Sequence, residues 1–395
     1  MKRLAGSLLG SWSVLLLMGF LGVAESQASE PLNFSIHQGY ISTRAMGMGN
    51  AFTALADDHN ALFYNPAALA LRERGNMHFF LRGGYDPGLF DFIGEIGDVE
   101  GTESEKAEAL TDLIESKYGS HFGNPLFALG GFWVRPNWGM AFLPADINLD
   151  LALHRQVGPM INVSTYVDST FVYGYGQSVD WLGANHPLAL GATVKAVHRV
   201  YIGESVSVAS LAAGDDVVDA DFAKEGMTFD VDLGTLYSPP IPESGPFRFL
   251  QYMKPTFAVV VRNVLDYGFP LQLGLTGDSP GEPPPLQRRI DLGSVYQLPQ
   301  LWVFDPRFSV DLRNILHDNW SFKKGLHVGA EFYWTMFNWW KGHWAAGLNQ
   351  GHLSLGLGAK MAFFQFDLAY WGEEVGTPSA PNKSERFMLE LSLDF

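Results

Sequence analysis

Three adjacent side chains, Asp57, Asp58 and His59, are of the types that ligate divalent metals. Neighbouring side chains rarely converge on one ion unless further ligands come from elsewhere, so a hydrogen-bonding or capping role is the alternative that we favour. The 11 histidines are scattered without an HExxH pair, and the chain has no cysteine for a zinc site. We therefore predict neither a bound metal nor a cofactor.

Motifs for covalent or phosphate chemistry are not found in the sequence either. The letters GxSxG occur once, at 277–281, but three prolines follow at 283–285, where a nucleophile elbow needs a helix. Gly47-x-Gly49 lacks the third glycine and the strand–helix context of a dinucleotide-binding turn. Glu373 and Glu374 are predicted to lie in an outer loop, where a solvated turn is the favoured role. Since no catalytic set can be assembled, we predict that the protein is not an enzyme.

The segment from Arg44 to Ala70 is too apolar for a linker and too rich in glycine for one helix. Its glycines permit a close approach of backbone to backbone, which suits a segment threaded into a confined space. Its Asn-Pro pair is a helix-start signal, with asparagine as the N-cap and proline at the first helical position. We predict a compact plug over residues 29–75, and the alternative is an ordinary surface loop before the first strand. The residues that define the plug motif are Arg44, Gly47, Gly49, Asp57, Asp58, Asn65 and Pro66.

The N-terminus has the pattern of a secretory signal peptide: Lys2 and Arg3, then an apolar run, then a small-x-small sequence that ends at Ala28. We predict that residues 1–28 are removed, with cleavage after Ala24 as the second choice. Their loss removes two positive charges and one negative charge, so the formal net charge of −16 becomes −17, which argues against nucleic acid as a partner. No later run reaches the ~18 apolar residues that a membrane helix needs.

Alternation of apolar and polar residues dominates the rest of the chain. In the C-terminal SERFMLELSLDF the apolar residues share one face and the polar residues share the other, as in a strand between lipid and a polar lumen. Leu391, Leu393 and Phe395 form the predicted barrel-assembly signal. Counting such segments from residue 76 gives about fourteen strands, an even number as single-chain bacterial barrels require. The sequence therefore predicts an all-β fold, an antiparallel transmembrane β-barrel over residues 76–395.

The predicted links between strands differ in length. The first, 86–124, and the fifth, 202–225, are long and fall on the outer side, whereas the sixth, 238–254, is longer than an inner turn should be. In the first link Thr102 and Glu105 form a capping box before an amphipathic helical pattern. This short helix is predicted to pack either over the outer mouth of the barrel or on residues of its own link.

Charged residues on the predicted inward faces should pair with each other or with the plug, because a partly dry lumen penalises an unpaired charge. A purely structural network is favoured over direct ligand contact. Pro144 interrupts the third predicted strand, where it removes a ladder donor and should force a bulge or a break. The inward charged residues are Arg262, Arg289, Asp291, Asp311, Arg313, Glu331, Lys360 and Arg386.

The Arg44–Ala70 segment, with its MGMGNA start, its Asp-Asp pair and its Asn-Pro-Ala, resembles the N-terminal hatch of FadL-type (FadL/TodX) outer-membrane barrels. It equally resembles the corresponding segment of PorV-like and TraF-like barrels. The C-terminal third, from GLHVGAEF to Phe395, is similar to the same broad group, whereas the middle of the chain matches only in pattern. The resemblance implies a 14-stranded barrel with a luminal plug. It also makes Pro144 suggestive of a lateral opening, with a simple strand end as the alternative.

The leading hypothesis that follows is a FadL-like barrel of the Gram-negative outer membrane that lets small hydrophobic compounds such as fatty acids cross. The alternative is a PorV-like or TraF-like barrel that transports nothing and acts in secretion or envelope assembly. A purely structural outer-membrane protein is a third hypothesis. The expected partners are outer-membrane lipid, the barrel-assembly machinery and a hydrophobic small molecule.

Overall fold

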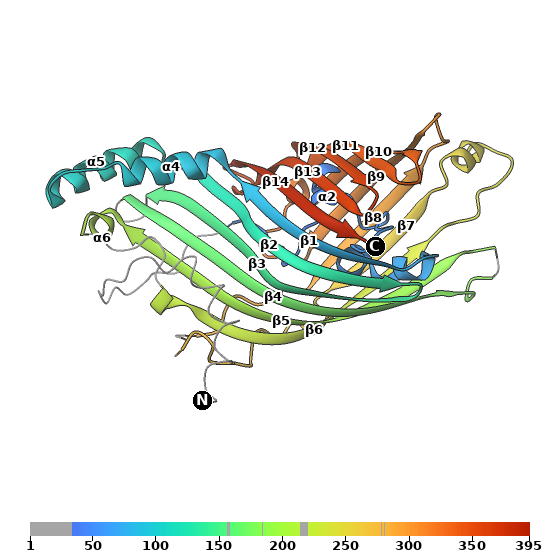
Figure 1. Cartoon of the computed structure of the whole chain (residues 1–395), viewed down its shortest axis with the longest axis horizontal. Coiled ribbons are helices and arrows are strands. Elements are labelled where there is room, and N and C mark those ends of the chain that lie inside the picture. The colour runs from blue at the N-terminus through green and yellow to red at the C-terminus, as the bar shows by residue number, and fades with distance from the viewer. Residues whose placement is uncertain (1–33, 156–158, 184, 214–219, 278, 280) are drawn as a thin grey trace.

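A computed structural model of the chain describes residues 34–155, 159–183, 185–213, 220–277, 279 and 281–395, so the predicted signal peptide lies outside the described residues. Fourteen antiparallel strands form a closed barrel in which sequence neighbours pair and the last strand closes on the first (Figure 1). The predicted fold class is confirmed. We call the end at which the first strand begins and the last one finishes the inner end, and the opposite end the outer end.

The strands follow one another along the chain from residue 76, and their number is the one predicted. They are β1 (Asn76–Tyr85), β2 (His121–Arg135), β3 (Trp138–Arg155), β4 (Pro159–Val179), β5 (Leu188–Ser207), β6 (Lys224–Tyr237), β7 (Thr256–Arg262), β8 (Arg289–Gln297), β9 (Phe304–Ile315), β10 (Leu326–Phe337), β11 (Trp340–Asn349), β12 (His352–Met361), β13 (Phe364–Glu374) and β14 (Lys383–Asp394). The turn between β12 and β13 has neither glycine nor proline, and Ala362 takes the left-handed conformation there, at φ +57°.

The outward face of the barrel is apolar. Exposed leucine and phenylalanine side chains cover its middle, among them Phe79, Leu81, Leu355 and Leu357. Aromatic pairs stand at both ends of this band: Tyr370 with Phe387 at the outer end and Trp334 with Trp340 at the inner end, with ring centroids 4.9 Å and 5.5 Å apart. An apolar band between two aromatic girdles is typical of transmembrane barrels.

Three helices lie at the outer end: α4 (Pro87–Gly97), α5 (Glu103–Ser116) and α6 (Val208–Ala213), at the left of Figure 1. They pack on the outer ends of β3–β5, where Leu151 and Leu153 join their apolar cluster. These leucines alternate with the lumen-facing Asp150, so they lie on the outside of the wall. Neither predicted position of α5, over the mouth or on its own link alone, describes these contacts fully. None of the helices in the described residues is long and apolar enough to cross a membrane.

Pro144 lies at a bulge in β3. In the pairing of β3 with β4 the register shifts between Leu143 and Asp146. In the pairing of β3 with β2 it shifts at the same place, between Leu129 and Gly131 of β2. Ser169 of β4 donates a hydrogen bond to the carbonyl oxygen of Pro144 at 2.6 Å, so the bulge is held. Pairing resumes on both sides, so of the two predicted outcomes, a bulge or a break, the described ladder shows the bulge. The bulge accommodates the missing donor of proline without parting the wall.

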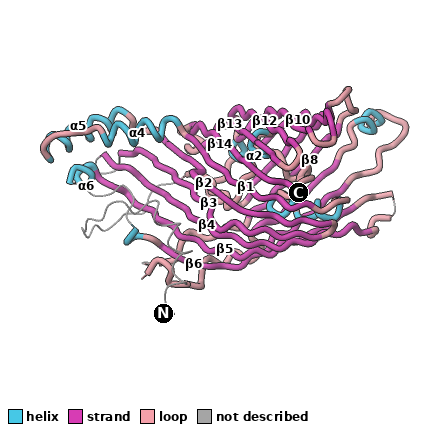
Figure 2. The backbone as a smooth tube through the Cα atoms, in the orientation of Figure 1, coloured by secondary structure: helices cyan, strands magenta, loops and turns pink. Residues whose placement is uncertain are grey.

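Residues 34–70 lie inside the barrel, and we call them the plug segment; the largely exposed residues 71–75 then lead into β1 (Figure 2). Three short helical pieces make up much of this segment: α2 (Thr43–Gly47), α3 (Ala61–Tyr64) and the 3-10 helix η1 (Pro66–Leu71). Their side chains pack with lumen-facing Phe80, Phe132 and Leu143 into the main core of the protein. The remaining short pieces are η2 (Ala220–Phe222), η3 (Arg248–Tyr252) in the long inner link, and α7 (Phe322–Gly325).

Candidate functional site: the barrel lumen

The two glycines of the plug motif lie directly against the wall. A Cβ on Gly47 would lie 2.6 Å from the Cα of Gly356 in β12, so the two backbones meet without side chains between them. Gly49 has φ +65° and would bring a Cβ within 2.6 Å of the carbonyl oxygens of Val328 and Leu348. A side chain at either position would displace the segment from the wall, which is the physical reason for glycine here.

Asn65 both begins η1 and fastens it to the barrel. Its Oδ1 accepts a hydrogen bond from the backbone N–H of Ala67 at 3.1 Å, as expected for an N-cap that precedes Pro66. Its Nδ2 donates to the carbonyl oxygens of Thr53 in the same segment and Thr235 in β6, both at 3.0 Å. Asn65 is fully buried, so every polar atom of its amide is used within the lumen.

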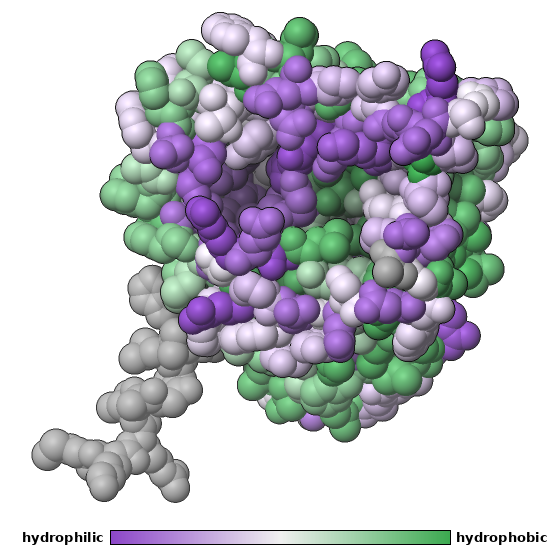
Figure 3. Space-filling model, turned by 90° about the vertical axis from the view of Figure 1, so that its right-hand side faces the viewer, coloured by the Kyte–Doolittle hydropathy of each residue, from purple (hydrophilic) through white to green (hydrophobic). Residues whose placement is uncertain are grey.

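A cluster of charges joins the segment to the wall at the inner end, and we call it the inner clamp: Arg44, Asp57, Asp58, Arg307 and Glu331. The guanidinium of Arg44 donates twice to the fully buried carboxylate of Glu331, at 2.7 Å each. It also donates to Asp57 at 2.7 Å and Asp58 at 2.8 Å, while Arg307 of β9 pairs with Asp57. Hydrophilic residues line a hollow at this end of the molecule (Figure 3).

The electrostatics of the inner clamp follow from these contacts. Burial by itself would raise the pKa of Asp57, but the charges of Arg44 and Arg307 outweigh it and hold that pKa well below its ordinary value. Both aspartates therefore act as acceptors for arginine, the alternative to metal binding. The next residue, His59, stacks on the ring of His78 with centroids 3.7 Å apart, and burial lowers its pKa to about 3.

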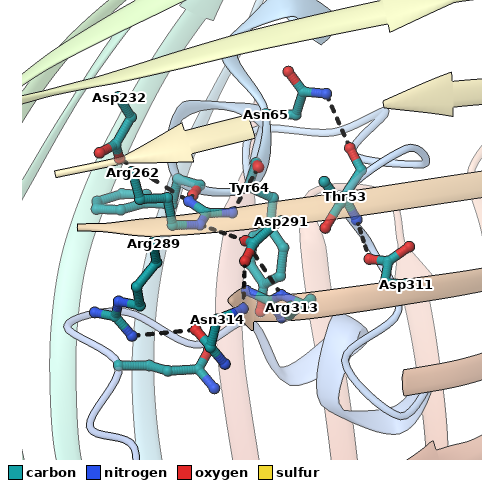
Figure 4. Close-up of polar contacts among 12 residues, drawn as sticks. Thr53, Tyr64, Asn65, Asp232, Arg262, Arg289, Asp291, Asp311, Arg313 and Asn314 are labelled. Carbon is teal, nitrogen blue, oxygen red and sulfur yellow. Dashed lines mark hydrogen bonds and ion pairs between the residues drawn. The ribbon is translucent and has the colours of Figure 1, made fainter. Parts of the chain in front are cut away.

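A second network lies further out and holds the backbone of the segment (Figure 4). Asp291 accepts from Arg262 at 2.6 Å and lies 3.5 Å from Arg313. Arg262 donates onward to the carbonyl oxygen of Tyr64 at 2.7 Å, and Arg313 to that of Asn50 at 2.9 Å. Asp311 accepts from the backbone N–H of Thr53 at 2.7 Å. These four predicted lumen charges thus contact the plug segment directly or through one another.

The other predicted lumen charges have different partners. Arg386 bridges Asp150 and Glu373, at 2.9 Å to each, near the outer end. Glu373 and Glu374 were predicted to be solvated loop residues and are instead buried at the end of β13. Lys360 pairs with Asp394 at the inner end, where Asp394 also accepts a hydrogen bond from Asn76 at 2.7 Å. Arg289 donates to two neutral oxygens, the carbonyl oxygen of His37 and Oδ1 of Asn314.

The predicted assembly residues lie where the barrel closes. Leu391 and Leu393 are on the outward face of β14 and pair in register with β1. The backbone N–H of Phe395 donates to the carbonyl oxygen of Met77 and the reverse bond is also made, both at 2.9 Å. The ring of Phe395 stacks on Phe363, with centroids 5.9 Å apart.

Several buried ion pairs were missed from the sequence. Arg82 of β1 pairs with Asp146 of β3 at 2.9 Å and lies over the ring of Tyr40. Arg199 of β5 makes a two-pronged contact with Asp168 of β4, at 2.8 Å and 2.7 Å. The alternation of faces along a strand could have identified these four residues as inward-facing, because each lies two positions from another inward residue of its strand.

Cavities surround the first described residues of the chain. The largest, about 770 Å³, lies at the outer end between the first link and the link from β13 to β14, and Phe34 borders it. Smaller cavities of about 150, 70 and 30 Å³ are each bordered by residues between Ser35 and Tyr40, and the first of them also by Pro284 and His317 of two outer links. This short segment therefore borders all four cavities, together with Phe34.

Comparison with known proteins places the fold. No family model and no curated protein matches the sequence. A TodX deltaS2S3 mutant monoaromatic hydrocarbon channel is similar in structure, with a TM-score of 0.50, 10% identity, and coverage of 90% of this chain and 98% of that chain. The Pseudomonas putida toluene transporter TodX gives a TM-score of 0.48 at 10% identity over 92% and 99% of the chains. A Pseudomonas aeruginosa FadL homologue gives 0.42 at 10% identity over 89% and 97%.

At this level of identity the similarity shows the fold alone. The barrel has the fold of the FadL-type channels, so the likeness inferred from the sequence is confirmed at that level.

Proposed function

We propose that this protein is an outer-membrane channel through which small hydrophobic compounds pass, with the inner end facing the periplasm. The single observation that carries the proposal is the series of cavities along residues 34–40, which begins at the outer mouth and ends against the plug segment. The printed descriptions of similar structures as hydrocarbon channels and toluene transporters support it. Fatty acids are the other cargo class that we propose to test.

The outer cavity is suited to a first encounter. Its volume of about 770 Å³ lies within the usual range for small-molecule sites, and aromatic and aliphatic side chains such as Phe34, Tyr118, Phe122 and Val375 contribute to its wall. Burial of apolar ligand surface there is worth ~25 cal/mol per Å² removed from water. A compound the size of toluene would thus gain a few kcal/mol before any polar contact is counted.

The path inward would follow the apolar side of the lumen. Tyr40, Phe63 and Phe132 pack together, with Tyr40 4.2 Å from Phe63 and 5.9 Å from Phe132 between ring centroids. Leu143 belongs to the same core and is followed by Pro144 at the bulge in β3. We keep this bulge as the proposed lateral exit, which requires β3 to part from a neighbouring strand when cargo passes.

The plug segment would be the barrier in the resting state. The inner clamp and the Asp291 network fix it to at least four strands, so its position is maintained by charge-assisted bonds as well as by packing. Passage therefore requires a local displacement of the plug segment, in addition to the parting of β3 at the proposed exit.

Uptake of radiolabelled toluene and oleate by intact cells that produce the protein tests this proposal. Ala380→Trp fills the outer cavity, which Ala380 lines, and should lower uptake several-fold relative to the wild type. Ser379→Trp is the matched control, because Ser379 is exposed on the same link and does not line the cavity. Equal uptake in Ala380→Trp and wild-type cells would contradict the proposal. No uptake above cells without the protein, together with a co-purifying protein partner, would favour the PorV-like or TraF-like alternative.

A further inference from the structure

Arg289 carries a buried positive charge without a carboxylate partner. It opens β8, is 8% exposed, and stands directly opposite Arg262 in the antiparallel ladder with β7. Like charges opposite one another destabilise a sheet. Arg262 is neutralised by Asp291, but Arg289 donates only to the neutral oxygens of His37 and Asn314, at 3.2 Å each. Its Nε has no hydrogen-bond partner and its guanidinium no ion pair among the described residues.

The carboxylates around Arg289 are already engaged by other groups. Asp291 accepts from Arg262 and from the backbone N–H of Asn314, at 2.6 Å and 2.8 Å. Asp168 is held by Arg199, and Asp232 by Lys195 at 2.6 Å. None of these carboxylates can pair with Arg289 without the loss of an existing ion pair. The positive charge of Arg289 is therefore left without a neutralising carboxylate in this arrangement.

The surroundings of Arg289 are positive even though the chain as a whole is acidic. Arg289 borders both the cavity of about 150 Å³ and the cavity of about 70 Å³. The cations that line the two cavities are Lys195, Arg199, Arg262, Arg289 and Arg313, and the carboxylates are Asp168 and Asp232. In a protein with a formal net charge of −16, this local excess attracts an anion.

The larger of the two cavities has walls suited to an aromatic ring. Tyr166 stacks on His37 with centroids 3.8 Å apart along one side, and Pro284, Pro285 and Leu286 line the cavity as well. A volume of about 150 Å³ equals that of an engineered protein cavity that binds benzene. On the other side of Arg289, the Nδ2 of Asn314 is a second buried donor without a partner among the described residues.

We propose that the lumen contains a binding site for a small aromatic carboxylate. The carboxylate pairs with the guanidinium of Arg289 and lies near the side-chain amide of Asn314. The ring occupies the cavity between Tyr166 and the Pro284–Pro285 segment. The site deepens the proposed function, on which it rests, by naming an aromatic acid as cargo. A buried cation without a partner carries a desolvation cost. An anion that pairs with it offsets this cost, whereas an uncharged hydrocarbon does not.

Calorimetric titration of the purified full chain in detergent with sodium benzoate tests the site apart from transport. Arg289→Gln should weaken benzoate binding at least ~10-fold, the usual loss for one charge-assisted contact. Arg288→Gln is the matched control, because Arg288 is exposed and donates only to the carbonyl oxygen of Val264. Benzyl alcohol, which has the ring without the charge, should bind more weakly than benzoate to the wild type and equally to both variants.

Further titrations with acetate, chloride and phosphate separate an aromatic acid from a simple anion. Affinity for any of them equal to that for benzoate would overturn the assignment of an aromatic ligand. Unchanged benzoate binding in Arg289→Gln would overturn the role of Arg289. Because these measurements require no passage through the barrel, they stand or fall independently of the toluene uptake experiment.

Thermal stability gives a second readout that a merely structural arginine would not produce. Arg289→Met removes the uncompensated charge at similar length, so its unfolding midpoint without ligand should equal or exceed that of the wild type. Benzoate should raise the midpoint of the wild type and leave that of Arg289→Met unchanged. A lower midpoint in the variant, with no effect of benzoate on either protein, would overturn the proposal.

Discussion

Removal of Arg44 should release the plug segment from the inner end of the barrel. Arg44 is the centre of the inner clamp, since one guanidinium bonds to Glu331 on β10 and to Asp57 and Asp58. Its side chain is 11% exposed and that of Glu331 is 0% exposed, so solvent screens the pair little. In Arg44→Met the carboxylate of Glu331 stays buried, with Arg307 at 3.7 Å as its remaining cation.

The size of the effect follows from the burial of the pair. Removing one partner of a buried ion pair costs about 3–5 kcal/mol, because an uncompensated charge is left behind. If the docked and displaced positions of the segment differ by this amount, the displaced population rises ~10²- to 10³-fold or more. The open probability of single channels in planar bilayers should increase accordingly, while the shift in gel mobility on boiling in detergent, a sign of an intact barrel, is retained.

Controls make this prediction specific to the clamp. Arg74→Met removes an exposed arginine close to the plug segment and should leave conductance unchanged. Glu331→Gln should raise conductance, as Arg44→Met does. The docking free energy lost in the double variant should be smaller than the sum of the losses in the two single variants. Wild-type conductance in Arg44→Met, together with an open channel after deletion of residues 44–70, would refute the reasoning, because the plug would then be held by other contacts.

Three further changes have expected outcomes. Lowering the pH from 7 toward 4 should raise conductance. In the docked segment His59 has a pKa lowered to about 3, so its neutral form stabilises docking above the ordinary pKa of 6.5, and this stabilisation is lost as the pH falls. His59→Gln should flatten the response, and an unchanged response in the variant would assign it to other groups. Pro144→Val should allow regular pairing of β3 with β4 and lower toluene uptake by intact cells several-fold, so wild-type uptake would remove the bulge from the pathway. Deletion of Phe395 removes two backbone bonds and an aromatic contact at the closing seam, and should lower the amount of barrel in outer-membrane fractions, whereas an unchanged amount would show that Leu391 and Leu393 suffice.

Period-two alternation predicted the barrel but not its internal pairing. It identified Glu331 and Asp291 as inward residues, yet Glu331 meets Arg44 across 287 positions of sequence. That contact depends on the register of many strands and on the path of the plug, neither of which a local pattern encodes. The alternation also stopped too early at β9: counting two residues back from Ser309 along the inward face would have found Arg307.

Other features were hidden by local composition. The alternation around Arg82 is obscured by Phe80, an apolar residue on the inward face between His78 and Arg82. Helix α5 was found from its capping box, but its position on the outside of β3–β5 depends on how far those strands extend beyond the aromatic girdle. Burial of Glu373 required the long-range partner Arg386. Local patterns in the sequence therefore predicted the helices and strands. The burial and the partners of individual side chains depended on tertiary contacts.

The glycines of the barrel wall are the counterpart of the plug. A glycine inside a strand usually weakens it, but several glycines of this wall leave room for a particular part of the plug segment. The wall positions are Gly191 against Pro66, Gly234 against Asn65, Gly329 and Gly347 against Met48 and Gly49, and Gly356 against Gly47. The plug and the wall are therefore complementary in shape at these positions. A chimera that takes its plug from a related barrel should dock it only if these wall positions are exchanged with it.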